Sequence, residues 1–284
     1  MLTIKGHRVE KLICQTRLSS VYLARHLESG TSRVVKFREL SQARAEFEFT
    51  ASVAAPNIVK VFEFSEFDGP KSNDMIQLFG RKTLGYFTME YIEGQTLGQL
   101  AAVRPFSPVQ AVSIMLKVSK ALLPLWLNGK VHADIKPGNI ILRTGSGPVV
   151  IDFGIGSDYA YGLQPKIEGK PFYGTLAFGA PERSYSGAVP HPSWDMFSIG
   201  LSTYYLTTGI NVTDWLKTQG IDSSAPSSAV LRRFNPLLYF DNKRVPMQLI
   251  QFLGMVCHQD PGLRLADPTR FIRKLEALQQ DLTA

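Results

Sequence analysis

The spacing of hydrophobic positions changes near Thr96. Before that residue, short β-branched and aromatic runs are separated by turn residues, a pattern typical of strands. One longer stretch, Ser41 to Ala55, lacks such breaks and ends before Pro56, so it predicts a helix. The first part of the chain therefore predicts a small α+β unit of five strands and one helix. The strand-like runs are Leu12-Ile13, Val21 to Ala24, Arg33 to Phe37, Ile58 to Phe62 and Tyr86 to Tyr91.

After Thr96 the pattern becomes helical. Ser107 and Pro108 predict a helix start, because a serine hydroxyl caps N–H groups and proline fits the first helical position. Gly94 precedes the change and is expected to be a hinge between two lobes. The predicted helices are Ala111 to Leu127, Trp194 to Thr208, Val245 to Gln259 and Pro268 to Leu282.

Length and composition are those of an ordinary globular protein. The 284 residues are 44% hydrophobic and 19% charged, which suits one large domain or two lobes that share a cleft. Two cysteines are too few for a disulfide scaffold and favour a reducing, cytoplasmic location. No apolar signal core follows Met1, and Lys117, Lys120 and Pro124 interrupt the longest apolar stretch, so no membrane span is expected.

The formal net charge of +7 suits polyanions such as nucleotides or nucleic acid. The basic residues are scattered, however, with no run of five or more. A generally basic surface is the simpler interpretation, and no nucleic-acid partner is expected.

The residues that carry chemistry lie between His132 and Gly154. Phosphoryl transfer needs metal ions on the phosphates, a cation beside them and an acceptor hydroxyl aimed in line. Two apolar runs, Ile140 to Leu142 and Val149 to Ile151, predict a hairpin that delivers the polar residues at its ends to one place. The segment offers two carboxylates, one ammonium and one amide at fixed spacing: Asp134, Lys136, Asn139 and Asp152.

Six motifs follow one another in order: Arg33 to Lys36, His132 to Asn139, Asp152 to Gly154, Ala180 to Glu182, Trp194 to Gly200 and Asp260 to Arg264. In this order they resemble the eukaryotic-type (Hanks-type) Ser/Thr protein kinases, including bacterial members. The resemblance implies a bilobal α+β protein kinase fold over residues 1–284. A small strand-rich N-lobe with one main helix (1–93) would precede a larger helical C-lobe (94–284). It also implies transfer of the γ-phosphoryl group of ATP to hydroxyls of protein substrates.

The resemblance implies a role for each polar residue of the segment. Asp134 accepts the proton of the substrate hydroxyl or orients it. Lys136 neutralises the transferring phosphate, at a spacing that resembles the Ser/Thr rather than the tyrosine class. Asn139 and Asp152 bind Mg²⁺, a hard cation that prefers oxygen ligands. From the residues alone, Asp134 could instead cap a turn and Lys136 could be a solvated loop lysine.

Lys36 is implied to contact the nucleotide phosphates and to be held by a helix glutamate. Glu46 and Glu48 compete for that position, and they point about 200° apart on a helix, so only one can face Lys36. The resemblance favours Glu46, because the family's spacing to the following Pro-Asn matches Pro56-Asn57 from that residue.

The segment from Met89 to Ile92 resembles the linker whose backbone groups hold the adenine. An ordinary buried strand would be equally apolar. The nucleotide-binding residues implied here are Ile13, Val21, Glu90 and Ile92. Two scaffold roles are also implied: an ion pair between Glu182 and Arg264, and an Asp195 side chain that braces the catalytic loop from a buried helix.

The loop from Cys14 to Ser20 departs from the family pattern, because Cys14, Thr16 and Ser19 replace its three glycines. Glycine allows close backbone approach to phosphate and positive φ. We therefore expect a stiffer loop with weaker or unusual nucleotide binding, in which Thr16 or Ser19 donates to phosphate and Arg17 adds a cation.

Ala133 stands where most family members carry an arginine that pairs with a phosphorylated activation loop. We therefore predict activity that does not depend on activation-loop phosphorylation.

Thr175 matches a family position that contacts Asp134 and Lys136. Ser65 to Leu84 is long for a strand connection and is either a disordered hairpin tip or an insert that docks a regulatory partner.

The leading prediction is an ATP- and Mg²⁺-dependent Ser/Thr protein kinase. The second is a pseudokinase or scaffold module, which the loop without glycines favours and the retained catalytic residues disfavour. The third is a small-molecule kinase of the aminoglycoside or choline type, for which the motif Ala180 to Glu182 is a poor fit.

Overall fold

The computed structural model describes residues 3–69, 75, 80, 82–163, 177–184, 188–218, 220, 240 and 245–283. The chain forms two compact units. Unit 1 comprises residues 1–54, 58–93 and 157–163, and unit 2 comprises residues 55–57, 94–156 and 164–284.

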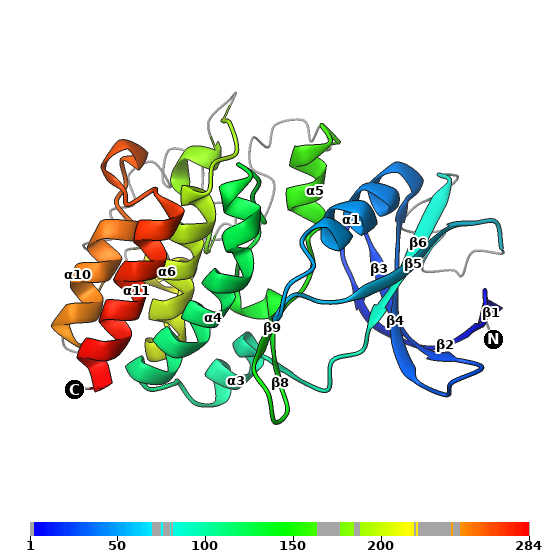
Figure 1. Ribbon diagram of the computed structural model, residues 1–284, viewed down its shortest axis with the longest axis horizontal. Helices are drawn as coiled ribbons and strands as arrows, with labels where there is room; N and C mark the ends of the chain where they lie inside the picture. The colour runs from blue at the N-terminus through cyan, green and yellow to red at the C-terminus, as the bar shows by residue number, and fades with distance from the viewer. Residues whose placement is uncertain are drawn as a thin grey trace. The chain divides into compact units, whose positions relative to one another are not determined.

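Unit 1 is built on a six-stranded antiparallel sheet with the order β1-β2-β3-β4-β6-β5. Helix α1 (Leu40–Ser52) packs across β4, β5 and β6, as Figure 1 shows beside the cyan and blue strands. The strands are β1 (Thr3–Ile4), β2 (His7–Gln15), β3 (Ser20–His26), β4 (Ser32–Glu39), β5 (Val61–Phe67) and β6 (Leu84–Glu90).

The two faces of β4 have different roles, because successive side chains of a strand point to opposite faces. Val35 and Phe37 belong to the hydrophobic core on one face, where the Phe37 ring meets the Phe67 ring edge-on at 5.2 Å. Lys36 and Arg38 occupy the other face and are also buried. Charged residues are almost never buried unless they are paired, so this face is a candidate site.

Three predictions for unit 1 need correction. The predicted helix to Ala55 ends at Ser52, and β1, only two residues long, was missed. The predicted strand at Ile58 begins instead at Val61. The cause is Asn57, whose carbonyl accepts from Val150 N–H at 2.8 Å and whose φ is 70°, so the chain turns there before the strand can start.

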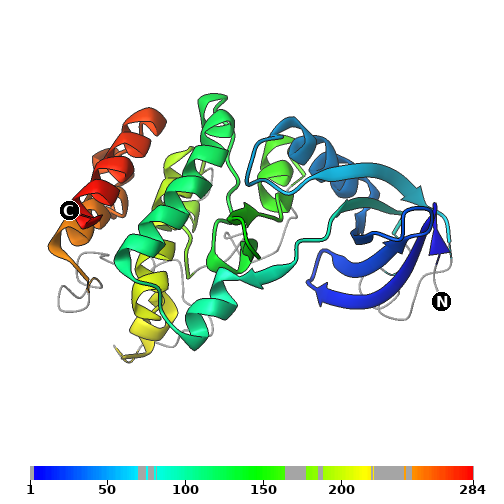
Figure 2. The same ribbon diagram turned by 60° about the horizontal axis from the view of Figure 1, so that its bottom comes forward.

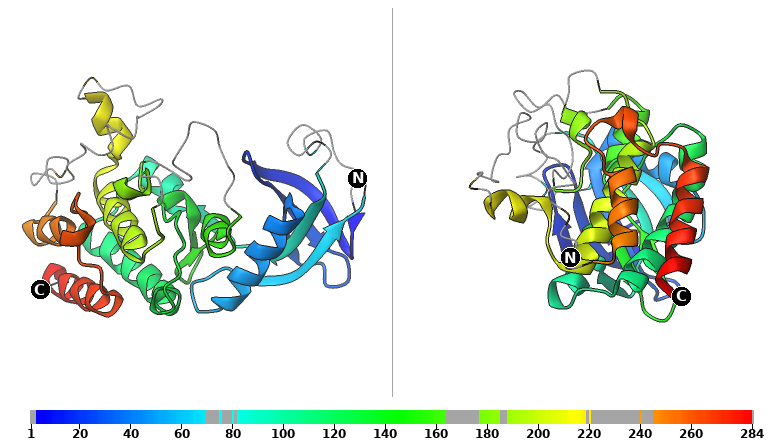
Figure 3. Two further views of the ribbon diagram at one scale, coloured as in Figure 1. Left: turned by 90° about the horizontal axis from the view of Figure 1, so that it is seen from above. Right: turned by 90° about the vertical axis from the view of Figure 1, so that its left-hand side faces the viewer.

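Unit 2 is mainly helical. Helix α4 packs against α11 and α6, and α10 packs against both α6 and α11, as the parallel helices of Figure 2 and the right-hand view of Figure 3 show. Its helices are α3 (Leu97–Val103), α4 (Pro108–Leu127), α6 (Ser193–Thr208), α7 (Val212–Thr218), α10 (Met247–Val256) and α11 (Pro268–Thr283). Its short elements are β7 (Gly94–Thr96), β8 (Ile140–Arg143), β9 (Pro148–Val150) and the 3-10 turns η1 (Pro137–Asn139), η2 (Pro181–Ser184) and η3 (Pro261–Leu263). Helix α5 (Gly154–Ala160) begins in unit 2, and its residues from Ser157 onward belong to unit 1.

The predicted start of α4 is confirmed. Ser107 accepts from Gln110 N–H, and the Gln110 side chain accepts from Ser107 N–H, which forms a capping box with Pro108 in the first turn. Helices α6 and α11 also match their predicted ranges closely. Helix α10 is shorter than predicted because Pro246 precedes it and Cys257 ends it.

Gly94 opens β7, where it lies opposite Arg143. An added Cβ would overlap the Leu142 carbonyl oxygen. Close packing of two backbones therefore requires glycine at this position.

Among the described residues, one helix is long and apolar enough by composition to cross a membrane, namely α4 with a mean hydropathy of 1.2. This differs from the expectation of no membrane span, which rested on Lys117, Lys120 and Pro124 within this stretch. Just over half of its 18-residue apolar window, 56%, is buried inside the structure. Its packing against α6 and α11 is that of a core helix.

Candidate active site

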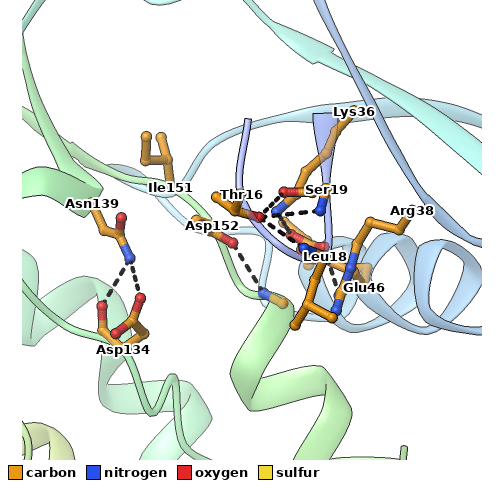
Figure 4. A network of polar contacts seen from close by, with 12 residues as sticks. Thr16, Leu18, Ser19, Lys36, Arg38, Glu46, Asp134, Asn139, Ile151 and Asp152 are labelled. Atoms are coloured by element: carbon orange, nitrogen blue, oxygen red, sulfur yellow. Dashed lines mark hydrogen bonds and ion pairs between the residues drawn. The ribbon is translucent and has the colours of Figure 1, made fainter. Parts of the chain in front are cut away.

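The hairpin expected between Asn139 and Asp152 is present in unit 2. Strands β8 and β9 pair antiparallel, with Ile140 opposite Val150. Just outside this pair, the N–H of Ile151 donates to the Asn139 carbonyl at 2.9 Å. The bond holds the backbone of Asn139 beside the residue that precedes Asp152, so both predicted metal ligands start from neighbouring points (Figure 4).

The Asp134 carboxylate is the centre of a polar cluster in the same unit. Its Oδ2 accepts from Lys136 Nζ at 2.7 Å and from Asn139 Nδ2 at 2.9 Å. Asn139 Nδ2 also donates to the Asp134 carbonyl at 2.9 Å. Asp134 is buried, and Lys136 is an ion-paired residue with 25% of its side chain exposed. Three residues with predicted chemical roles are thus in direct contact.

His132 supports this cluster from behind. The Asp134 N–H donates to His132 Nδ1 at 3.2 Å, while His132 Nε2 lies 3.2 Å from the Ile151 carbonyl. A lone pair is needed at Nδ1 and a proton at Nε2, which assigns the neutral Nε2–H tautomer. The ring also contacts Phe153, with centroids 4.6 Å apart. His132 therefore links the Asp134 backbone to the strand that leads to Asp152.

Asp195, in α6, braces the same loop. Its Oδ2 accepts from His132 N–H at 2.7 Å and from the Trp126 indole at 2.9 Å, and its Oδ1 accepts from Ala133 N–H at 2.8 Å. Asp195 is fully buried, so these three donors supply the hydrogen bonds that water would otherwise provide. The predicted bracing role of Asp195 is confirmed.

Two residues beside the cluster have a left-handed backbone. Ala133 has a φ of 62° and Asp152 a φ of 64°. This conformation costs about 1–2 kcal/mol for a residue with a Cβ. At Ala133 the cost is offset by Asp195, which holds two consecutive N–H groups. Backbone strain is therefore present on both sides of the predicted chemistry.

Helix α6, which carries Asp195, is in close contact with the end of α10. An added Cβ at Gly200 would overlap Cys257 Sγ, which itself lies 3.5 Å from the Phe197 carbonyl. Burial raises the pKa of the Cys257 thiol well above its usual range. The absence of a side chain at Gly200 thus lets the two helices meet.

The predicted ion pair between Glu182 and Arg264 is confirmed. The guanidinium bonds both carboxylate oxygens, with Nη2 at 2.9 Å from Oε2. Arg264 also donates to the carbonyls of His258 and Gln259, so it fixes the turn after α10. The pair is bidentate, so it holds Glu182 and the turn after α10 in a fixed orientation.

Asn139 and Asp152 fit a magnesium ion. The amide nitrogen of Asn139 is bonded to Asp134, which directs the amide oxygen away from these two acceptors. Mg²⁺ is usually held by one or two protein oxygens together with substrate phosphates, so a larger protein cage is not needed. Among the described residues, no group of three His, Cys, Asp or Glu side chains could hold a metal ion.

In unit 1, Lys36 Nζ lies 2.7 Å from Glu46 Oε1, and both side chains are buried. Glu48, the competing residue, is exposed. The geometry therefore places Glu46 and not Glu48 against Lys36. Val21 lies directly opposite Lys36 on β3, so these two predicted nucleotide-binding residues occupy adjacent cross-strand positions.

The loop that replaces the glycine-rich pattern is a tight hairpin closed on itself. Gln15 pairs with Ser20, and Thr16 N–H donates to the Ser19 carbonyl at 2.9 Å. Thr16 Oγ1 accepts from Leu18 N–H at 3.2 Å and from Ser19 N–H at 3.1 Å (Figure 4). The hydroxyl thus binds backbone donors of the tip. None of residues 14–20 has a positive φ, so the hairpin forms without glycine.

The other predicted nucleotide-binding residues have different environments. Ile13 is the extra residue of a bulge in β2 and is 50% exposed. Glu90 is tied to the Lys60 backbone, because its Oε1 accepts from Lys60 N–H at 2.9 Å. Ile92 is buried.

Sequence reasoning missed two charged residues beside the Lys36–Glu46 pair. Arg38 Nη1 donates to Glu46 Oε2 at 3.0 Å, and its Nη2 donates to Asp158 Oδ2 at 2.9 Å. The signal for Arg38 was in the strand pattern, since a charge two residues after Lys36 lies on the same face of an apolar strand. No local signal marked Asp158, which is 120 residues away in sequence.

Several predicted positions lie outside the described residues. Thr175 is one of them. Half of the insert between Ser65 and Leu84 also lies outside them, although its Met75 is described and is buried in the core of the unit 1 sheet.

Comparison with known proteins assigns the family. The model of the protein kinase domain family matches residues 8–278. The chain belongs to the eukaryotic-type (Hanks-type) Ser/Thr protein kinase family. The predicted family and the bilobal α+β kinase fold class are confirmed.

Relatives of this kinase domain include bacterial and animal proteins. The serine/threonine-protein kinase PknB of Mycobacterium tuberculosis is 28% identical over 202 residues, 68% of this chain and 30% of that protein. A probable serine/threonine-protein kinase of Corynebacterium efficiens is 30% identical over 184 residues, 64% of this chain and 26% of that protein. Sperm motility kinase 2B of Mus musculus is 25% identical over 252 residues, 87% of this chain and 46% of that protein. The chain spans less than half the length of these relatives.

Proposed function

We propose that the chain is a protein serine/threonine kinase that transfers the γ-phosphoryl group of ATP to hydroxyls of protein substrates. The observation that carries this proposal is the cluster in which Asp134 Oδ2 accepts from both Lys136 and Asn139. A carboxylate, an ammonium and an amide in direct contact are the groups that phosphoryl transfer uses for a base, a phosphate cation and a metal ligand.

In the proposed reaction, the Asp134 carboxylate accepts the proton of the substrate hydroxyl. Lys136, already paired with Asp134 at 2.7 Å, is positioned to neutralise charge on the transferring group. The neutral Nε2–H tautomer of His132 and the buried Asp195 hold the Asp134 backbone in place. The protein's contribution is thus positioning and electrostatics, as this reaction class requires.

Asn139 and Asp152 would hold Mg²⁺, which neutralises charge on phosphate oxygens when bound. Lys36, oriented by Glu46, would contact the nucleotide phosphates. Ile13, Val21, Glu90 and Ile92 would complete the nucleotide-binding residues.

We further propose that residues 1–284 form one kinase domain, with an N-lobe over 1–93 and a C-lobe over 94–284, that acts in the cytoplasm. Regulation by a partner protein is part of this proposal. Ala133 has no side chain that could read an activation-loop phosphate, so activity is independent of that modification.

The test of the reaction is transfer of labelled γ-phosphate to a generic basic protein, with Asp134→Asn as the control. We expect the variant to lose about 10³-fold in rate, the middle of the range for general base catalysis. Equal signals from the two proteins would contradict the role of Asp134, and no signal from the wild type would contradict kinase activity.

A phosphatase treatment tests regulation separately. We expect the rate of phosphate transfer to change by less than about twofold after the activation segment is dephosphorylated. The reason is that the residue directly before Asp134 is Ala133 and not arginine. Mass spectrometry would verify that the phosphate has been removed. Abolished transfer would show that another residue reads the phosphate.

A pseudokinase is the second candidate, and one observation favours it. Thr16 Oγ1 already accepts the N–H groups of Leu18 and Ser19, which a nucleotide phosphate would otherwise use. Calorimetric titration with Mg²⁺-ATP beside the transfer assay separates the candidates, because weak nucleotide binding without transfer supports the pseudokinase and binding with transfer supports the kinase.

A further inference from the structure

The face of β4 that carries Lys36 also carries a second buried cation, Arg38. The two residues alternate along one strand, so their side chains leave the same face of the sheet. Arg38 has an exposed fraction of only 2%. Its burial requires partners, because a guanidinium stays charged at any pH that a protein tolerates.

Arg38 bridges two buried carboxylates. Its Nη1 donates to Glu46 Oε2 at 3.0 Å and its Nη2 donates to Asp158 Oδ2 at 2.9 Å. Lys36 Nζ donates to the other oxygen of Glu46, Oε1, at 2.7 Å. Each oxygen of the Glu46 carboxylate therefore faces a different cation of the same strand, and Figure 4 shows Lys36, Glu46 and Arg38 in this arrangement.

The four charged residues of this network lie in one unit. Two cations and two carboxylates are buried together, and all four residues belong to unit 1. Only arginine suits the bridging position, because its planar fork presents separate N–H groups to two acceptors, whereas lysine offers a single nitrogen.

Asp158 connects this network to the segment after Asp152-Phe153-Gly154. It lies in α5, four residues after Gly154, in the activation segment. Its side chain is completely buried. In this family a phosphate on that segment is usually read by the arginine that Ala133 replaces. Here a carboxylate of the segment itself is already paired with an arginine of β4.

We propose that Arg38 is a positioning residue that makes the orientation of Glu46, and through it of Lys36, depend on the activation segment through Asp158. The carboxylate of Asp158 is encoded in the sequence, and it supplies the negative charge that phosphorylation would otherwise add. The proposal deepens the proposed kinase function and rests on it.

The kinetic test uses Asp158→Asn, which keeps the shape of the side chain and removes its charge. We expect kcat/KM for ATP to fall about tenfold, the middle of the range for coupling within one salt-bridge network, while KM for the protein substrate stays unchanged. Arg38→Met should give at least the same loss, and Arg38→Met combined with Asp158→Asn should be no worse than Arg38→Met alone. Arg38→Lys should not fully restore the rate, because the ammonium lacks the planar fork that offers each carboxylate a separate nitrogen.

Matched controls come from an exposed ion pair of the same unit. Arg44 pairs with Glu66 at 3.5 Å, and both side chains are more than half exposed. Arg44→Met and Glu66→Gln should leave kcat/KM for ATP within about twofold of the wild type, as expected for exposed pairs.

Amide hydrogen exchange gives a readout that does not need activity. In Asp158→Asn and Arg38→Met, peptides covering residues 157–163 and α1 should exchange about tenfold faster, and peptides of α11 should not change.

If the wild type transfers no phosphate, the kinase proposal fails, and exchange together with ATP affinity still decides the role of Arg38. The proposal is overturned if Asp158→Asn changes neither exchange nor kcat/KM for ATP. It is also overturned if kcat/KM falls equally for ATP and for the protein substrate while the melting temperature drops, since that result marks a purely structural ion pair.

Discussion

The loop around Asp134 and the loop from Cys14 to Ser20 are both short connections with predicted roles in phosphoryl transfer, but they are held in different ways. The first has a left-handed residue, Ala133, and is fixed by a buried carboxylate from a distant helix. The second has no positive φ and is closed by its own threonine hydroxyl.

The difference shows which features a site can lose. Asp195 lies more than sixty residues after the loop that it braces, so strain there is supported by the fold of unit 2. The Thr16 hairpin is closed by bonds among residues 15–20. Local closure removes the need for glycine, but it also occupies N–H groups that could bind phosphate. We therefore expect the two loops to respond differently to substitution.

The largest effect is expected for Asp195→Ala. The change leaves the N–H groups of His132, Ala133 and Trp126 without their acceptor, and each unsatisfied buried donor costs about 1–3 kcal/mol. The free energy of unfolding, measured in urea, should fall by on the order of 4 kcal/mol. Labelling of the buried Cys257 thiol, which packs against the same helix, should accelerate in parallel.

Asp214→Ala is the control for that change, because Asp214 is 49% exposed and pairs only with the exposed Lys217 among the contacts described. It should cost less than about 0.5 kcal/mol. A loss for Asp195→Ala that is equally small would mean that the Asp134 loop needs no external brace.

A smaller effect is expected for Thr16→Ala, and it is a gain in ATP affinity instead of a loss of stability. The substitution releases the N–H groups of Leu18 and Ser19 without adding the flexibility of glycine. ATP affinity in a calorimetric titration should rise about tenfold, which corresponds to one net hydrogen bond of about 1.4 kcal/mol. Thr31→Ala, in the exposed turn between β3 and β4, should leave the affinity unchanged. Unchanged affinity for Thr16→Ala would show that the tip does not compete with phosphate.

The smallest effect is expected for Ala133→Gly. Glycine relieves the left-handed conformation at φ 62° but loses more entropy on folding, so the two terms leave a net gain of about 0.5 kcal/mol in unfolding free energy. Ala101→Gly, inside α3, should instead cost about 1 kcal/mol. A loss at both positions in thermal unfolding would show that Ala133 is not strained.

Much of this site could be predicted from the chain because its parts are close in sequence. The hairpin that carries Asn139 and Asp152 follows from two apolar runs, and the helix start at Ser107 follows from local capping. Both features depend on backbone geometry that neighbouring residues determine. The choice of Glu46 over Glu48 came instead from the spacing to Pro56-Asn57 in the family that the chain resembles.

Other features depend on tertiary contacts that have no local pattern. The bond between Arg38 and Asp158 joins residues 120 positions apart. The late start of β5 depends on the hydrogen bond that the Val150 N–H donates to the Asn57 carbonyl. The closure of the Thr16 hairpin was missed for another reason, since the hydroxyls were expected to donate to phosphate and the structure uses Thr16 Oγ1 as an acceptor.

The contact between Gly200 and Cys257 has a consequence for how this sequence can drift over generations. Because a Cβ at position 200 would occupy the space of the sulfur, the two positions are not free to vary one at a time. Descendants with alanine at 200 should survive only with a smaller residue at 257 and an altered or displaced Val256, whose Cγ2 would lie 2.8 Å from the same Cβ. Paired substitution at these two sites would therefore record, in sequence alone, that α6 and α10 still touch.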